Sequence, residues 1–267
     1  MNLSLKQLTS NSTVAPNLVF VHGLGSAATA WKPLEPLLID CFNLITVDLP
    51  GHGYSPYSDG DEMDPLSLAM AITRELSEQL GIEEFHLVGN SLGGWIALEI
   101  AAAYPERVKS VTALAPAGLW LATFVQRLSG TAMLRAFTKN FAALAPLMLK
   151  SEWARKIGFS DVSPLWRNFS YELCLDATNA MIHSPGYFPA WDGMLKKRFA
   201  AKISAEIPVK IIFGDSDNTL PARNCQERAM VPAHAQWITI AQSGHAPMWD
   251  HPSEVASYIL QSAGILN

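Results

Sequence analysis

The stretch "VGNSLGGW", residues 88–95, places Ser91 between Gly89 and Gly93. An apolar run, "FHLVG", precedes it and "LGGWIALEI" follows it, which predicts a strand that turns abruptly into a helix. The residue at such a bend has a strained backbone, and the flanking glycines leave room for it. Its oxygen would project above the sheet edge, beside the free amides of a helix N-terminus. The same spacing also occurs in plain turns, but the strand before it and the helix after it favour a nucleophilic serine.

Short apolar runs closed by turn residues recur along the chain and predict strands within residues 17–23, 42–53, 83–91, 108–116, 207–217 and 235–245. Helical stretches alternate with them at residues 29–39, 66–80, 92–104, 221–230 and after Pro252. Gly81 has the position of a C-terminal cap, and Pro105 stops the helix that follows Ser91. This alternation predicts an α/β fold, a mostly parallel sheet with helices on both faces.

Residues 117–203 interrupt the alternation of strands and helices. They hold four of the eight Trp and seven of the eleven Phe, in pieces that look helical. From residue 118 to 200 there are ten Lys or Arg against five Asp or Glu, although the whole chain carries a net charge of −5. We therefore expect a core domain made of residues 1–116 and 204–267, with an inserted α-helical cap (lid) domain at 117–203.

The composition of the 267 residues excludes several classes of protein. Apolar residues make up 49 % and charged residues 16 %, so the chain can bury a large core and is not of the disordered class. The net negative charge argues against nucleic-acid binding. The most apolar stretch, residues 111–125, is broken by Pro116 and Gly118, so we expect no transmembrane segment. Three scattered cysteines and the lack of a signal-like start predict a cytoplasmic protein.

A serine nucleophile needs a base to take its proton and a carboxylate to orient that base. Of the seven histidines, His245 in "SGHAP" is the best base, because it follows the apolar run "WITI" and so lies on a loop at a strand end. For the acid, the loop after "IIFG" offers Asp217, with Asp215 in reserve.

The oxyanion of a tetrahedral intermediate needs two amide donors. Leu92 is at the helix N-terminus, and Leu24 in "HGLG" at the end of a strand is the second candidate, although a tight glycine turn without a catalytic role would have the same sequence. His22 and His52, each beside a glycine, are expected to hold loops together.

Five blocks resemble the α/β-hydrolase superfamily in order and spacing: "FVHGLGSAATAW", "TVDLPGHGYS", "VGNSLGGWIALEIAAAYPERV", "FGDSDNTLP" and "GHAPMWDHP". The order Ser91, Asp217, His245 is the order of nucleophile, acid and base in this fold. The resemblance is greatest to serine carboxylesterases and extends to hydrolases of ring-cleavage dienoates. Dehalogenases and epoxide hydrolases of this fold have an aspartate where this chain has Ser91, which disfavours both. The opening strands of the family are expected to be reduced to "LSLKQL".

The resemblance and the residues together predict an enzyme without cofactor or metal that cleaves small-molecule carboxylic esters with an apolar acyl group through an acyl-enzyme. One alternative is hydrolysis of a carbon–carbon bond in an anionic dienoate, with Arg127, Arg135 or Arg167 as partner of its carboxylate. Another is a weakly hydrolytic ligand receptor. The basic cap would attract an anionic substrate, an acidic carrier or an acidic lipid surface, unless it is a plain solvated face.

An apolar acyl group needs an apolar pocket near the nucleophile. Large apolar side chains beside the motifs or in the cap are the candidates for lining it, and each of them also fits simple core packing. They are Trp95, Trp120, Met133, Phe137 and Trp249.

Overall fold

The computed structural model describes residues 1–127 and 142–266. They contain a seven-stranded sheet with the order β1-β3-β2-β4-β5-β6-β7, in which β1 is antiparallel to β3 and every other neighbouring pair is parallel. The strands are β1 (Leu5–Leu8), β2 (Asn17–Val21), β3 (Asn43–Val47), β4 (Phe85–Asn90), β5 (Val108–Leu114), β6 (Val209–Gly214) and β7 (Gln236–Ile240). The expected mostly parallel α/β sheet is confirmed, and its one antiparallel strand comes from "LSLKQL".

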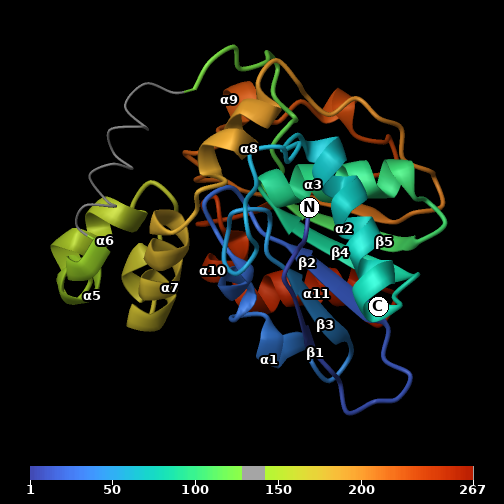
Figure 1. Ribbon diagram of the computed structural model, residues 1–267, viewed down its shortest axis with the longest axis horizontal. Coiled ribbons are helices and arrows are strands. Elements are labelled where there is room, and N and C mark those ends of the chain that lie inside the picture. Colours follow the sequence, from blue (N-terminus) through green and yellow to red (C-terminus); the bar gives the residue numbers. More distant parts are fainter. Residues whose placement is uncertain (128–141, 267) are drawn as a thin grey trace.

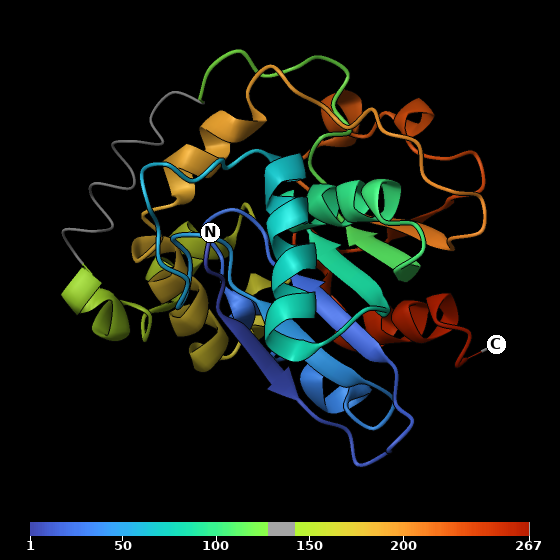
Figure 2. The same ribbon diagram turned by 45° about the vertical axis from the view of Figure 1, so that its right-hand side comes forward.

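Helices cover both faces of the sheet (Figures 1 and 2). The longer ones that flank the sheet are α2 (Pro65–Leu80) and α3 (Leu92–Ala103) on one face and α11 (Pro252–Ser262) on the other. Alternation along β2 explains how one strand serves two cores: Leu18 and Phe20 join the α11 side, whereas Val19 and Val21 join the α2 and α3 side. Since both faces are buried, the central strands read as continuous apolar runs.

Two expected helices are each divided in the structure. The stretch 29–39 forms η1 (Ala28–Trp31) and α1 (Glu35–Leu38), because Pro33 and Pro36 cannot donate the hydrogen bonds of one continuous helix. The stretch 221–230 forms α9 (Ala222–Cys225) and η4 (Arg228–Met230). Here the amide of Glu227 donates to the carbonyl of Leu119 (2.7 Å) instead of to a helical carbonyl.

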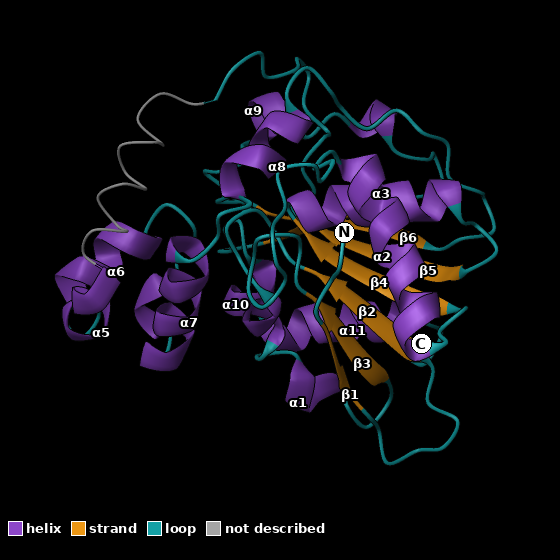
Figure 3. Ribbon diagram, viewed as in Figure 1, coloured by secondary structure: helices purple, strands orange, loops and turns teal. Residues whose placement is uncertain are grey.

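Between β5 and β6 the described chain contains η2 (Ala142–Leu144), α5 (Ala145–Met148), α6 (Glu152–Phe159), η3 (Trp166–Asn168), α7 (Tyr171–Ile182) and α8 (Tyr187–Met194). These elements lie beyond the carboxyl ends of the parallel strands, and α5 to α7 stand well away from the sheet (Figure 3). They have a small apolar cluster of their own, which includes Phe159, Trp166 and Phe169. The division into core and cap at residues 117 and 203 stays a prediction.

Short helices also lie in the loops at the carboxyl end of the sheet. Among them is α10 (Pro247–Asp250), which directly follows the loop after β7. In the part of the chain that the structure describes, no helix has both the length and the apolar character needed to cross a membrane.

Candidate active site

Ser91, Asp217 and His245 follow three strands of the same sheet. Ser91 comes directly after β4, Asp217 lies in the loop after β6, and His245 lies in the loop after β7. Since these strands are parallel, their carboxyl ends meet at one edge, where the arrowheads point toward α8 and α10 (Figure 3). In open α/β sheets this edge is where ligands bind.

The backbone of Ser91 has the strained conformation that its position predicts. Its φ is 55° and its ψ is −118°, a region that non-glycine residues rarely occupy. The strand–helix bend is tied to the neighbouring strand, because the Ser91 amide donates to Leu114 O (2.9 Å) and the Ser91 carbonyl accepts from Ala117 N (2.9 Å). The surrounding fold thus fixes the strain, as is typical of functional sites.

Gly89 and Gly93 are required by close backbone contact. A Cβ atom at residue 89 would lie 2.1 Å from Gly93 O, and one at residue 93 would lie 2.0 Å from Val21 O. Real Cβ atoms do not approach oxygens so closely, so α3 can begin against β2 only with glycine at these positions. The small residues around Ser91 therefore allow the sharp entry of β4 into α3.

Gly93→Ala is expected to destabilise the fold by about 3 kcal/mol or more, since the added methyl group overlaps rigid backbone. Gly158→Ala in α6 is the matched control, because no atom lies within 4 Å of its added Cβ. Alanine there should leave stability unchanged or raise it by about 0.5–1 kcal/mol. Urea unfolding measures both variants, and equal stabilities would contradict the close contact at residue 93.

Asp217 is hydrogen-bonded to His245. The Nδ1 atom of His245 lies 3.0 Å from Asp217 Oδ2, and the other carboxylate oxygen accepts from the amides of Thr219 (2.9 Å) and Leu220 (2.8 Å). The Asp217 side chain is 1 % exposed and that of His245 is 13 % exposed. Burial by itself would raise the pKa of Asp217, but the charge of His245 and these hydrogen bonds bring it below its usual value. The carboxylate is thus ionised and fixed against the imidazole.

The alternative acid, Asp215, has different surroundings. It is exposed, and its Oδ1 atom accepts a hydrogen bond from the neighbouring Ser216 hydroxyl (2.8 Å). Of the two aspartates that the sequence offered, Asp217 is the one whose carboxylate contacts His245.

A side chain next to the bend links it to the loop of His245. Asn90 Nδ2 donates to His245 O (3.0 Å) and to Leu114 O (3.1 Å). Within the described residues, the hydrogen bonds do not include one between the Ser91 hydroxyl and the His245 ring. In enzymes with a serine nucleophile, the hydrogen bond between serine and base is often long without substrate and tightens when substrate binds.

Leu24 and Leu92 carry the two amides expected to hold an oxyanion. Neither amide has a protein acceptor within residues 1–127 and 142–266, so both remain available as donors. Leu92 opens α3, where the helix dipole adds to the attraction of negative charge. Met181 and Tyr187 pack against Gly25, beside Leu24.

His22 and His52 hold the loop that contains Leu24, as expected from their neighbours. His22 Nδ1 lies 2.7 Å from Gly23 O, and its Nε2 accepts from Leu49 N (3.0 Å). His52 Nε2 accepts from Gly25 N (3.2 Å). The accepting nitrogens require neutral rings, and burial lowers the pKa of His22 to about 4.

We expect the free energy of unfolding to fall as the pH decreases from 7 to 5. His22 has a folded-state pKa of about 4, and so has His86, through burial and then the charge of Lys109. An unfolded histidine titrates near 6.5, so protons bind the unfolded chain first, and each ring costs about 2 kcal/mol over this interval. Urea unfolding of the wild type and of His86→Gln measures the effect. The variant should lose about half of the pH dependence, whereas a flat profile for the wild type would contradict buried neutral rings.

Asp250 holds the backbone of the loop in front of His245. It accepts hydrogen bonds from Gly244 N (2.7 Å), from the Ser243 hydroxyl (3.3 Å) and from the Ser163 hydroxyl. Burial raises the pKa of its carboxyl, and the three donors offset only part of this effect. The amide of His245 itself donates to Val162 O (2.7 Å), so the segment before η3 also supports this loop.

Three of the five candidates for an apolar pocket lie in the described chain, and all three pack against other side chains. Trp95 and Trp120 are 2 % and 4 % exposed and meet edge to face, with ring centroids 5.3 Å apart. Trp249 is half-buried and packs against Phe169. These contacts fit the packing alternative, and a role in substrate binding stays a prediction. Met133 and Phe137 lie outside the described residues.

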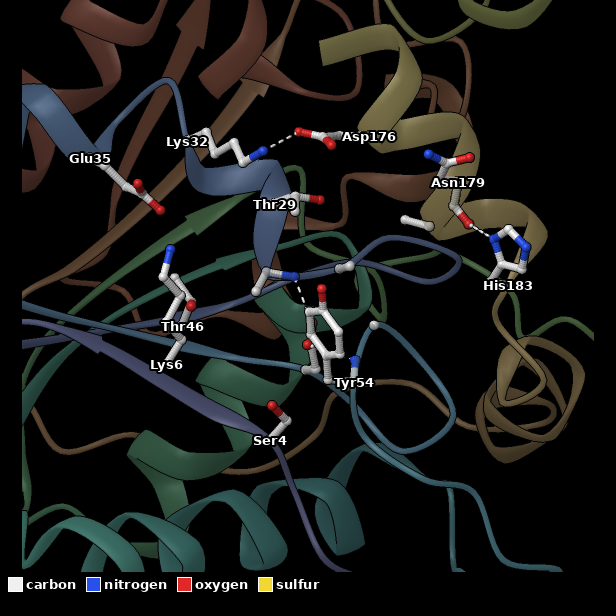
Figure 4. A pocket seen from close by; sticks show the side chains of 15 residues that line it. Ser4, Lys6, Thr29, Lys32, Glu35, Thr46, Tyr54, Asp176, Asn179 and His183 are labelled. Atoms are coloured by element: carbon white, nitrogen blue, oxygen red, sulfur yellow. Dashed lines mark hydrogen bonds and ion pairs between the residues drawn. The ribbon is translucent and has the colours of Figure 1, made fainter. Parts of the chain in front are cut away.

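A cavity of about 600 Å³ lies between η1, the β1–β3 edge of the sheet and α7, and none of the three candidate catalytic side chains lines it. Polar and charged side chains are among those that line it, and Lys32, directly after η1, points across it toward Asp176 of α7 (2.5 Å; Figure 4). Thr46 Oγ1 is buried at this cavity without a hydrogen-bond partner within the described chain. Lysine and carboxylate side chains both line the cavity, so its charge favours neither an anionic nor a cationic ligand.

Two polar residues that bind the backbone of the loop around His245 were not identified from the sequence. Asn90 was treated only as the variable residue of the Gly-x-Ser-x-Gly spacing, and Asp250 only as a letter within "GHAPMWDHP". Their signal was present, because a polar residue directly before a buried bend and a carboxylate just beyond the loop of His245 both need partners. Which partners they have depends on loops that meet only in three dimensions.

A family model and several proteins of known sequence match most of this chain. Residues 18–258 match the model of the family described as "Alpha/beta hydrolase family". The chain is 28 % identical over 265 residues to the human monoacylglycerol lipase, covering 92 % of this chain and 74 % of that protein. It is 27 % identical over 251 residues to the dihydrolipoyllysine-residue acetyltransferase component of the acetoin cleaving system of Pseudomonas putida. There the alignment covers 91 % of this chain, which spans 62 % of the relative's length.

A solved structure shares the fold across nearly the whole chain. The meta-cleavage product hydrolase of Pseudomonas fluorescens superposes with a TM-score of 0.73 at 19 % identity, covering 98 % of this chain and 94 % of that one. At this identity the likeness shows the fold alone.

Proposed function

The chain belongs to the alpha/beta hydrolase family, and from this premise we propose that it is a serine hydrolase that cleaves carboxylic esters through an acyl-enzyme. One observation carries the proposal. The buried Asp217 carboxylate is hydrogen-bonded to His245 at the edge of the sheet where Ser91 stands in a strained turn. This pairing supplies an oriented base beside a serine that needs one.

In the proposed acylation step, Ser91 Oγ attacks the ester carbonyl carbon while His245 Nε2 takes the hydroxyl proton. Asp217 on Nδ1 fixes the tautomer that leaves Nε2 free, and it stabilises the imidazolium that forms. The amides of Leu24 and Leu92 bind the oxyanion, and loss of one such donor typically costs about 2.7–4 kcal/mol of transition-state stabilisation. The carbon–oxygen bond then breaks, and the alcohol leaves with the proton from His245.

In the proposed deacylation step, a water molecule attacks the acyl-enzyme. His245 takes one proton from this water and returns it to Ser91 Oγ as the carboxylic acid leaves. Each step uses side chains and amides of this chain, so the scheme calls for no cofactor. The same two amides serve both tetrahedral intermediates, because the carbonyl oxygen occupies one place throughout.

The substrate is proposed to be a small ester with an apolar acyl group. The human relative is named a monoacylglycerol lipase, which is consistent with such an ester. Met133 and Phe137, two of the residues expected to line the acyl pocket, lie outside the described residues.

Carbon–carbon bond hydrolysis of an anionic dienoate is less well supported. It requires a free cation for the substrate carboxylate, yet two of the three candidate arginines are already paired. Arg127 Nε binds Asp192 (2.6 Å), and Arg167 Nε binds Glu152 (3.0 Å). The third, Arg135, lies outside the described residues. The same ion pairs also occupy guanidinium groups that an anionic partner of the basic cap would need, which fits a solvated face.

A panel of p-nitrophenyl esters from acetate to long acyl chains, assayed beside a ring-fission dienoate, tests the function. We expect saturable hydrolysis of the esters with a clear optimum in acyl length. Turnover of the dienoate far above that of every ester would support the carbon–carbon reaction instead. No turnover of any compound, with a ligand-dependent change in melting temperature, would identify a receptor.

A further inference from the structure

A second cavity lies at the opposite end of the sheet from Ser91. It has a volume of about 570 Å³ and is formed where β4 to β7 begin and α11 ends. Its lining includes His86, Lys109, Lys210, His234 and Gln236. Two lysines and two histidines thus meet in one hollow, and among its lining residues there is no aspartate or glutamate.

Strand register explains why polar groups collect under α11. His86 lies beside Ser110, and Thr112 lies beside Lys210, so their side chains share one face of the sheet. His86 Nδ1 bonds to the Ser110 hydroxyl (2.8 Å), and Thr112 Oγ1 bonds to Ser262 of α11 (3.2 Å). Most of this polar row is therefore satisfied within the protein.

Lys210 is the exception in the row. It is 7 % exposed, yet within residues 1–127 and 142–266 no carboxylate or hydrogen-bond acceptor contacts its ammonium group. Desolvation lowers the pKa of its amine, with no opposing charge or hydrogen bond to restore it. Its aliphatic stem is thus buried, whereas Nζ keeps contact with solvent at the cavity and has no partner within the described protein.

The end of α11 does not supply that partner. The carbonyls of Ile259, Leu260 and Gln261 accept from the amides of the turn that closes the helix, in which Gly264 has a φ of 69°. Lys109 also faces the cavity, and its ammonium contacts Glu84 (2.7 Å) at the exposed rim. Lys210 is thus the deep cation of the cavity and Lys109 the outer one.

We propose that this cavity binds a small molecule through an oxyanion, phosphate or carboxylate, with Lys210 as its charge partner and Lys109 at the entrance. An oxyanion in the cavity would give this ammonium group the charge-assisted hydrogen bonds that the protein does not. The volume exceeds that of the anion alone, so an organic group can accompany it. His86 lies five residues before Ser91 on β4, about 16 Å along the strand, so this ligand does not compete with an ester at Ser91.

Isothermal titration calorimetry with sodium phosphate and, separately, sodium acetate at constant ionic strength tests the proposal. We expect saturable binding of at least one anion to the wild type, weakened at least about tenfold in Lys210→Met and less in Lys109→Met. Lys202→Met removes an exposed lysine outside the cavity and should bind as the wild type does. Circular dichroism melting in anion-free buffer checks the fold, and Lys210→Met should melt at the wild-type temperature or above it.

Three results would overturn the proposal. The first is the absence of saturable binding of both anions to the wild type. The second is equal weakening in Lys210→Met and Lys202→Met. The third is a lower melting temperature of Lys210→Met without anion, because it would mean that the ammonium already has a stabilising partner. Ester turnover does not enter these readouts, so failure here leaves the proposed function untouched.

Discussion

Ser91→Ala is expected to lower kcat for ester hydrolysis by about a millionfold, with the fold retained. The substitution removes only the oxygen that is proposed to attack the ester, because alanine has the Ser91 side chain without its hydroxyl. The residual rate would come from the oxyanion amides and from substrate binding. Initial rates on the best ester of the panel, with circular dichroism as the check on folding, measure the effect.

Ser216→Ala is the matched control for the serine. Ser216 lies in the loop after β6, and its hydroxyl donates to the adjacent Asp215 (2.8 Å). Its removal should leave kcat within about twofold of the wild type, as expected for a surface change. A similar loss in both variants, or full activity of Ser91→Ala, would remove Ser91 from the role of nucleophile.

Asp217→Asn is expected to lower kcat by about ten-thousandfold, whereas Asp215→Asn should have little effect. An asparagine amide at 217 can hold His245 in place, but it favours the tautomer whose Nε2 carries the proton, so the ring cannot accept one from Ser91. Asp215 is exposed and makes no contact with the ring within the described residues.

This pair of variants is matched in charge and lies two residues apart on one loop. Equal losses would mean that the loop rearranges during turnover, and a larger loss for Asp215→Asn would reverse the assignment of the acid. KM should change little in either variant, because neither carboxylate is proposed to contact the substrate. Steady-state kinetics over a range of ester concentrations separates kcat from KM.

The sheet and the bend at Ser91 could be predicted because their signals are local. Apolar runs of strand length identified the central strands, and the glycines at 89 and 93 identified the bend. The close contacts at those glycines give the physical reason, since no side chain fits against α3 at residue 89 or against β2 at residue 93. Sequence patterns succeed where neighbours along the chain determine the conformation.

The choice between Asp215 and Asp217 could not be made firmly from the sequence. Both stand on the same loop, and only the path of the chain after β6 decides which carboxylate is buried against His245. The same limit applies to Asn90 and Asp250, whose partners come from other loops.

Three further features were not predicted from the sequence, each for its own reason. They are the unpaired Lys210 and the divided helices at 29–39 and 221–230. In the sequence, Lys210 looks like an ordinary polar residue of a strand. Only the strand register shows that it lies under α11. The division at Glu227 depends on its hydrogen bond to Leu119, more than one hundred residues away in sequence. Pro33 and Pro36, by contrast, were visible signals whose effect was underestimated.

Labelling with a fluorophosphonate probe, followed by peptide mass spectrometry, tests the central claim most directly. We expect one adduct per chain, on the peptide that contains Ser91, with none in Ser91→Ala and slower labelling in His245→Ala. An adduct on a different residue, or hydrolysis of esters by a protein that the probe leaves unmodified, would contradict the role of Ser91.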